Sequence, residues 1–103
     1  MLTIEASLRQ KLMTAFAPVE LQILNQSENH RGHLHLPEEA HGETHFFVKV
    51  VSEVFISLSR VERHRRVQGL LEEERTRGLH ALSLSLLTPE ENLVAGNPQG
   101  KND

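Results

Sequence analysis

Hydrophobic residues follow two spacings along this chain, and each spacing predicts a kind of element. Over 3–16 the apolar side chains recur four positions apart, as in the buried stripe of an amphipathic helix. The stripe consists of Ile4, Leu8, Leu12 and Phe16. Thr3 is suited to cap this helix and Pro18 to end it. Polar and apolar residues then alternate over 20–24, which predicts a short strand.

The segment 45–53 is rich in valine and phenylalanine and predicts the clearest strand of the chain, and its apolar character continues to Ile56. Between the two strands, 25–44 has no apolar periodicity and is punctuated by glycine and proline, so a long loop is expected. Because this connection holds no helix, we expect the two strands to pair as an antiparallel hairpin.

A long helix is predicted from Ser59 to Gly78. Ser59 and Glu62 form an S-x-x-E capping box, and Gly78 suits the left-handed position at the helix end. On a helical wheel His64 shares one arc with apolar residues, so its side chain is expected on or beside the buried face. The residues of this arc are Val61, His64, Val67, Leu70 and Leu71.

The last strand is expected over 79–87, where leucines alternate with serines, and the sequence TPEE at 88–91 begins a short helix that runs to Ala95. Residues 96–103 are polar and predict a disordered tail after a domain of residues 1–95. The fold class is therefore α+β: one compact domain in the order α-β-β-α-β-α, with a three-stranded mixed sheet and helices packed on one face.

Composition narrows the function. The 103 residues fit one domain, and they include no cysteine, tryptophan or tyrosine. Disulfides and thiolate metal sites are thus excluded, and base stacking is disfavoured. A net charge of −3 argues against a surface that is basic throughout. No signal-like or membrane-spanning segment is seen, so a cytoplasmic location is expected. No catalytic motif occurs, and we predict that the protein is not an enzyme.

Histidine is the residue type that stands out, with seven in all and five of them from His30 to His45. Neutral imidazole is a good ligand for transition metals. His80 opens the last predicted strand, and His45 opens the strand over 45–53, where local hydrogen bonding is expected. His35 and His41 are expected at the surface of the long loop, where together with His33 they could bind zinc or nickel only adventitiously.

Four arginines surround His64 in the first turns of the long helix. They are Arg60, Arg63, Arg65 and Arg66. Arginine binds phosphates, and it also forms bidentate pairs with carboxylates of a partner. A third interpretation is a solvated surface in which these arginines pair with nearby glutamates. The sequence leaves all three open.

Several motifs together resemble the BolA family. RHRRVQGLLEEE at 63–74 and GLHALSL at 78–84 match its helix and its H-A-L strand, and TPEE at 88–91 matches its ending. Upstream, S-x-x-H at 27–30 runs into HRGH, which is similar to an H-A-G-H loop variant, and GETHF at 42–46 also fits. The chain departs from the family pattern at Gln26, Ser57 and Asn92, in place of glutamate, glycine and tryptophan.

This resemblance implies a fold similar to class II KH domains and a heterodimer with a CGFS-type monothiol glutaredoxin. The two proteins would share a [2Fe-2S] cluster, held on the glutaredoxin side by its cysteine and a glutathione thiol. His80 is then one ligand and His30 the other, with His33 a close competitor. No cofactor is expected to bind tightly to the isolated chain, which would be a monomer or weak homodimer.

The resemblance also implies an alternative, DNA binding and transcription regulation through the KH-like fold. The nucleic-acid or partner-binding residues would be Arg60, Arg63, Arg65, Arg66 and His64. This alternative ranks second, because the chain contains no G-x-x-G loop of the kind that clamps nucleotides. Membrane binding is not expected.

Overall fold

Three strands and five helical segments make up residues 3–26 and 45–95, the part of the chain that this computed structural model describes. In chain order they are α1 (Ile4–Phe16), β1 (Glu20–Asn25), β2 (His45–Val51), the 3-10 helix η3 (Glu53–Ser57), α2 (Arg60–Leu70), α3 (Glu72–Thr76), β3 (Ala81–Leu87) and α4 (Pro89–Ala95). The predicted α+β order is confirmed, with η3 added and the long helix divided in two.

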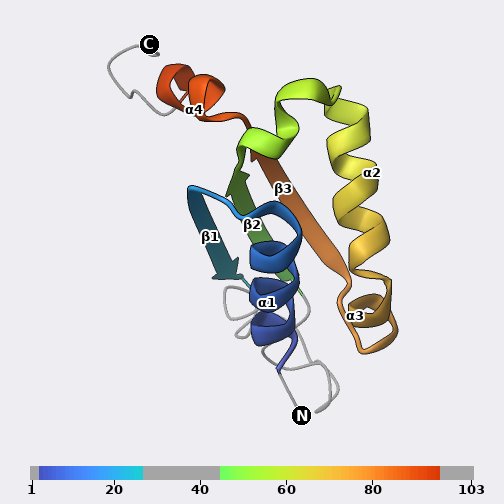
Figure 1. Ribbon diagram of the computed structural model, residues 1–103. Coiled ribbons are helices and arrows are strands. Elements are labelled where there is room, and N and C mark those ends of the chain that lie inside the picture. Colours follow the sequence, from blue (N-terminus) through green and yellow to red (C-terminus); the bar gives the residue numbers. More distant parts are fainter. Residues whose placement is uncertain (1–2, 27–44, 96–103) are drawn as a thin grey trace.

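The strands form one sheet in the order β1-β2-β3. β1 and β2 pair antiparallel, as predicted for the hairpin, while β2 and β3 pair parallel. The parallel register runs from His45 opposite Ala81 to Val51 opposite Leu87. As a result, the unit from η3 to α3 is the crossover that carries the chain from β2 back to the start of β3 (Figure 1).

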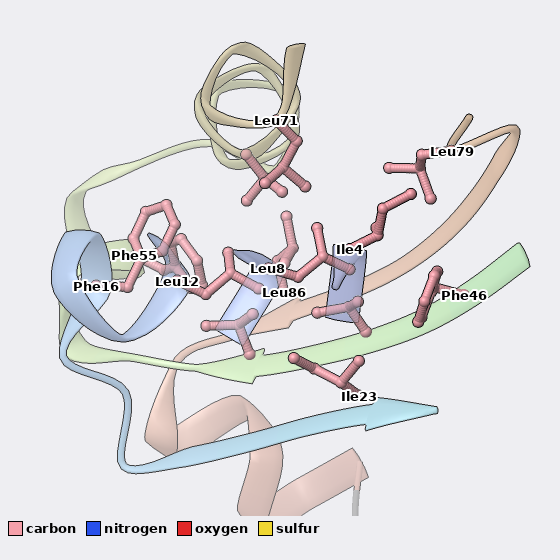
Figure 2. Packing of buried hydrophobic residues seen from close by; sticks show 13 residues of the cluster. Ile4, Leu8, Leu12, Phe16, Ile23, Phe46, Phe55, Leu71, Leu79 and Leu86 are labelled. Atoms are coloured by element: carbon pink, nitrogen blue, oxygen red, sulfur yellow. The ribbon is translucent and has the colours of Figure 1, made fainter. Parts of the chain in front are cut away.

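The core lies between the sheet and a layer formed by α1, α2 and α3, which cover one face (Figure 1). The predicted stripe of α1 is buried in full, and Figure 2 shows its side chains pointing toward the sheet on one side and toward Leu71 on the other. Phe16 also contacts Phe55, with ring centroids 5.1 Å apart. Burying such a layer of leucine, isoleucine and phenylalanine side chains is the main force that holds the domain together.

The predicted continuation of the strand to Ile56 is wrong, because β2 ends at Val51 and η3 follows. Ser52 causes the change of direction. Its buried hydroxyl donates to the carbonyl of Phe16 (2.6 Å) and accepts from the amide of Val54 (3.1 Å). The turn carries Phe55 into the core and leaves Ile56 exposed.

The long helix predicted from Ser59 to Gly78 is interrupted at Leu71. Contacts from elsewhere in the fold explain the break. The ammonium of Lys11 in α1 donates to the carbonyl of Leu70 (3.4 Å), and the guanidinium of Arg75 donates to that of Gln68 (3.0 Å). These donors satisfy carbonyls at the end of α2, so the chain can turn there and bury Leu71.

The predicted helix caps are confirmed. Thr3 caps α1, and Ser59 forms the reciprocal box with Glu62. A second box joins Thr88 and Glu91, where each side chain bonds to the other residue's amide (3.1 and 2.9 Å). These caps satisfy amides that otherwise lack partners, and each contributes about 1 kcal/mol.

Helix α4 lies beyond the carboxyl end of β3 and buries none of its residues (Figure 1). The family's tryptophan is replaced here by Asn92, whose amide donates to the carboxylate of Glu20 (3.3 Å). The predicted loop over 27–44 and the predicted tail over 96–103 lie outside the described residues. Among the helices that are described, none has the length and hydrophobicity needed to cross a membrane.

Candidate functional site

His80 is the first exposed residue after α3. Gly78 lets the chain leave the helix with a φ of 120°, a conformation that other residues rarely adopt. The amide of Leu79 then donates to the carbonyl of Glu74 (3.2 Å), and the side chain of Leu79 is buried in the core. The buried side chain of Leu79 on one side and strand β3 on the other therefore fix the backbone of His80 at the surface.

The amino ends of β2 and β3 lie side by side, so His45 and His80 share one end of the sheet. His45 is the strand partner of Ala81, the residue that follows His80. Its carbonyl also accepts from the amide of Gln26 at the end of β1 (2.8 Å). The chain therefore leaves the sheet at Gln26 and returns at His45, and both points lie at the end that carries His80 (Figure 1).

His30 and His33, the predicted loop ligands, lie outside the described residues. Only a limit on their reach follows from the structure. His30 is the fourth residue after Gln26, and four extended residues span at most ~14 Å. The pairing of His30 or His33 with His80 stays a prediction. The residues that flank the segment 27–44, Gln26 and His45, lie at the same end of the sheet as His80.

That His45 and His80 share one end of the sheet could not be predicted from the sequence, which indicated only local hydrogen bonding for His45. The sequence does show that His45 begins one strand and that His80 directly precedes another. These positions imply a shared end of the sheet only if the two strands are known to be parallel and in register. Among the described residues, no group of three or more histidine, aspartate or glutamate side chains is arranged to hold a metal ion.

Arg63 was predicted to contact nucleic acid or a partner, but in the structure its side chain is directed into the protein. Its side chain is only 6% exposed, and its guanidinium bonds inside the protein. It donates to the carbonyls of Leu58 (3.1 Å) and Leu86 (3.0 Å) and forms a bidentate pair with Glu91 (2.7 and 3.3 Å). It also lies 5.6 Å from the centre of the Phe55 ring. Arg63 therefore joins α2 to β3 and α4.

The Arg63 pair also fixes the charge of Glu91. Hydrogen bonds from the Arg63 guanidinium, and then from the Thr88 amide, lower the pKa of Glu91 from 4.5 to about 2. Both donors favour the ionised carboxylate. Arg63 and Glu91, which meet at the carboxyl end of β3, are consequently both charged at neutral pH and bonded to each other.

The helical wheel prediction for His64 is also wrong. The buried face of the α2–α3 unit runs through Arg63, Val67, Leu71 and Glu74, so His64 and Val61 are exposed. The helical wheel placed only apolar residues and His64 on the buried face, whereas the structure buries the long side chain of Arg63 there with hydrogen-bond partners inside the protein. The Nδ1 of His64 lies 3.1 Å from the carbonyl of Arg60. Because a carbonyl only accepts, Nδ1 carries the proton in this bond, which leaves Nε2 as the free ring nitrogen.

Arg60, Arg65 and Arg66 are exposed on α2, and their binding to nucleic acid or a partner stays a prediction. Arg60 lies 3.8 Å from Glu91, while Arg65 and Arg66 form no ion pair with any residue in the described ranges. Since Arg63 is buried, the predicted basic cluster contains three available arginines in place of four.

A family model of BolA-like proteins matches residues 12–91, which include most of the described fold and His80. The chain belongs to the BolA family. The matched range contains both His80 and Arg63.

Curated BolA relatives carry two kinds of name. The chain is 46% identical over 84 residues to protein BOLA1, chloroplastic, of Arabidopsis thaliana, a match that covers 82% of this chain and 52% of that protein. It is 39% identical over 90 residues to the DNA-binding transcriptional regulator BolA of Haemophilus influenzae, covering 87% of this chain and 82% of the relative. The chain thus spans about half the length of the Arabidopsis relative.

Solved BolA structures have the same fold. BolA1 from Arabidopsis thaliana superposes with a TM-score of 0.78 at 43% identity, over 88% of this chain and 97% of that one. BolA1 from Mus musculus gives a TM-score of 0.71 at 37% identity, over 96% and 74%. The mixed sheet and its helical layer are therefore the architecture of the family.

Proposed function

We propose that this BolA-family protein is the partner of a CGFS-type monothiol glutaredoxin and shares a [2Fe-2S] cluster with it, in iron–sulfur cluster trafficking or iron homeostasis. The observation that carries the proposal is the setting of His80. Its imidazole is exposed, held by a buried neighbour, and placed at the sheet end where the histidine-rich segment begins and ends. A cytoplasmic location stays a prediction.

The donor chemistry fits one side of a shared cluster. His80 offers one imidazole nitrogen, and the second ligand from this chain is taken to be His30, with His33 as the competitor. The partner supplies thiolates, which this cysteine-free chain cannot. Imidazole in place of thiolate on one iron raises the potential of such a cluster. The role of this protein in the proposal is to present the two imidazoles to the cluster.

The test is to purify the protein together with a CGFS-type glutaredoxin and glutathione and to record visible absorption and circular dichroism spectra. We expect a spectrum that differs from that of the glutaredoxin alone. His80→Ala should abolish the difference. Gln10→Ala is the control, because it alters an exposed residue of α1 to which no binding role is assigned, and it should leave the spectrum unchanged.

Single replacements of the two loop histidines decide the second ligand. His30→Ala should alter the spectrum more than His33→Ala does. An unchanged spectrum in His80→Ala would refute the ligand assignment, and the absence of any complex would refute the proposed partnership.

A second candidate is DNA binding, which the name of the Haemophilus influenzae relative and the three exposed arginines of α2 favour. Binding to phosphates weakens steeply with salt. Replacing Arg60, Arg65 and Arg66 together by glutamate should abolish binding to a DNA duplex in fluorescence anisotropy. Neutralising them with glutamine should lower the slope of log K against log salt by about 3. A protein that does not bind the duplex even at low salt would eliminate this candidate.

A further inference from the structure

The outer face of the α2–α3 unit carries an open groove of about 770 Å³, here called the α2 groove. It faces away from the core, so nothing in the packing of the domain requires its shape. Its lining combines basic, polar and small side chains. The lining residues are Arg60, Val61, His64, Arg65, Gln68, Gly69, Glu72 and Arg75.

Gly69 leaves the helix backbone bare within this groove. Glycine inside a helix is unfavourable relative to alanine, because its backbone loses more freedom on folding. A Cβ at Gly69 would meet nothing within 4 Å, and the residue has no positive φ that would demand glycine. The described structure therefore gives no packing or conformational reason for glycine here. Close approach of another chain to the helix backbone is such a reason.

Arginines outnumber acidic residues in the lining of the groove, although Arg60 also lies 3.8 Å from Glu91. Arg60 and Arg65 extend from α2, and Arg75 donates from α3 to the carbonyl of Gln68 (3.0 Å) while other guanidinium N–H groups are left to bind elsewhere. Glu72 is the acidic residue of the lining. Val61 is 59% exposed in the same face, two turns from Gly69. The groove thus presents Val61 and the bare backbone at Gly69, with arginines on both sides of them.

We propose that the α2 groove docks an acidic amphipathic helix of a partner protein. The apolar stripe of that helix would lie over Val61 and Gly69, and its carboxylates would pair with Arg60, Arg65 and Arg75. Helix-in-groove binding uses this combination, and arginine pairs with carboxylates in bidentate geometry. α2 has 11 residues and is ~16 Å long, which matches about three turns of a docked helix.

A protein helix fits this surface better than a nucleic acid does. A phosphate backbone would use the arginines but gain nothing from an exposed valine or a bare glycine. The inference is also separate from the proposed cluster, because it concerns another face and its test needs neither a metal nor His80.

The experiment measures binding of synthetic helical peptides of about four turns to the full chain by fluorescence anisotropy. One peptide is acidic with an apolar stripe, the second has the same stripe with lysines for glutamates, and the third has the acidic composition in scrambled order. We expect the first to bind about tenfold more tightly than the other two, because only it combines charge and stripe.

Two pairs of variants locate the binding. Gly69→Gln should weaken the acidic peptide about tenfold while raising the midpoint of thermal unfolding, since glutamine favours helix and blocks the approach. Gly69→Ala should raise the midpoint as well but weaken binding less. Arg65→Glu should weaken binding several-fold, whereas Arg66→Glu, with the same charge change at a position outside the groove lining, should not.

Four results would overturn the proposal. They are no binding of the acidic peptide, equal binding of the scrambled peptide, equal losses in the Arg65 and Arg66 variants, and unchanged binding in Gly69→Gln. Displacement of the peptide by duplex DNA at equal concentration would assign the surface to nucleic acid instead and would likewise overturn it.

Discussion

At the carboxyl ends of β2 and β3 polar side chains bond to the protein itself, whereas at the amino ends the imidazole of His80 faces solvent. Ser52, Arg63 and Thr88 are all buried at the first end, and their hydrogen bonds join α1, α2 and α4 to the sheet. At the second end, Leu79 and Gly78 fix the backbone and leave His80 exposed. A polar residue that already has internal partners contributes to stability, while an exposed and positioned one is available to a ligand.

The largest difference between the two ends should appear on removing Arg63. Arg63→Ala leaves Glu91 without its bidentate partner and strips the buried carbonyl of Leu86 of a donor. We expect a loss of about 3 kcal/mol in the free energy of unfolding, measured by urea denaturation. The matched control Arg66→Ala should change it by no more than about 0.5 kcal/mol. Similar losses in the two variants would contradict the structural role of Arg63.

Ser52→Ala should have the next largest effect. It removes the donor to the carbonyl of Phe16 and the acceptor of the Val54 amide, in a fully buried position. A loss of about 2 kcal/mol is expected in the same denaturation experiment. Ser57→Ala is the control, because that serine is exposed at the end of η3. Equal losses of unfolding free energy in the two serine variants would show that the hydrogen bonds of Ser52 do not stabilise the fold.

Acid should weaken the same end through Glu91. The folded pKa of about 2 lies below the ordinary 4.5, so the carboxylate stabilises the fold above pH 4.5, and this contribution disappears as the pH falls toward 2. Because the side chain is 34% exposed, solvent screening limits the effect to the order of 1 kcal/mol. Glu91→Gln should flatten the pH dependence of unfolding in this window, whereas the exposed control Glu90→Gln should keep it. Equal curves for wild type and Glu91→Gln would contradict the assignment.

The smallest effect on stability is expected at the other end. His80→Ala removes an exposed imidazole from a backbone that Gly78 and Leu79 already hold. The free energy of unfolding should change by no more than about 0.5 kcal/mol. A loss comparable to that of Arg63→Ala would mean that His80 is structural, and the contrast between the two ends would no longer hold.

Local signals in the sequence were sufficient for most of the secondary structure. The spacing of Ile4, Leu8, Leu12 and Phe16 placed the buried stripe of α1, and the boxes at Ser59 and Thr88 placed the starts of α2 and α4. These signals suffice because caps and stripes depend on residues within one or two helical turns. The break at Leu71 had no such signal, since one of the donors that satisfy the carbonyls there is Lys11 on a different helix.

The candidate site shows the same division more sharply. His80 could be named from its motif, and its exposure follows from the residues beside it. That His80 and His45 share one end of the sheet depends on the parallel pairing of β2 and β3, which are separated in sequence by the whole crossover. The roles within the arginine cluster required the fold as well, because four similar side chains differ only in what surrounds them.

Spacing, capping boxes, the missing cysteines and the family motifs were enough to predict most of the elements and the family and to single out His80 as a candidate ligand. Which side chains are buried, and which residues pair across the fold, was decided only by the tertiary structure. Arg63 became a structural residue because Leu86 and Glu91 converge on it, while Arg60, Arg65 and Arg66 stayed at the surface. The physical reason is that hydrogen-bond partners distant in sequence exist for a side chain only once the chain has folded.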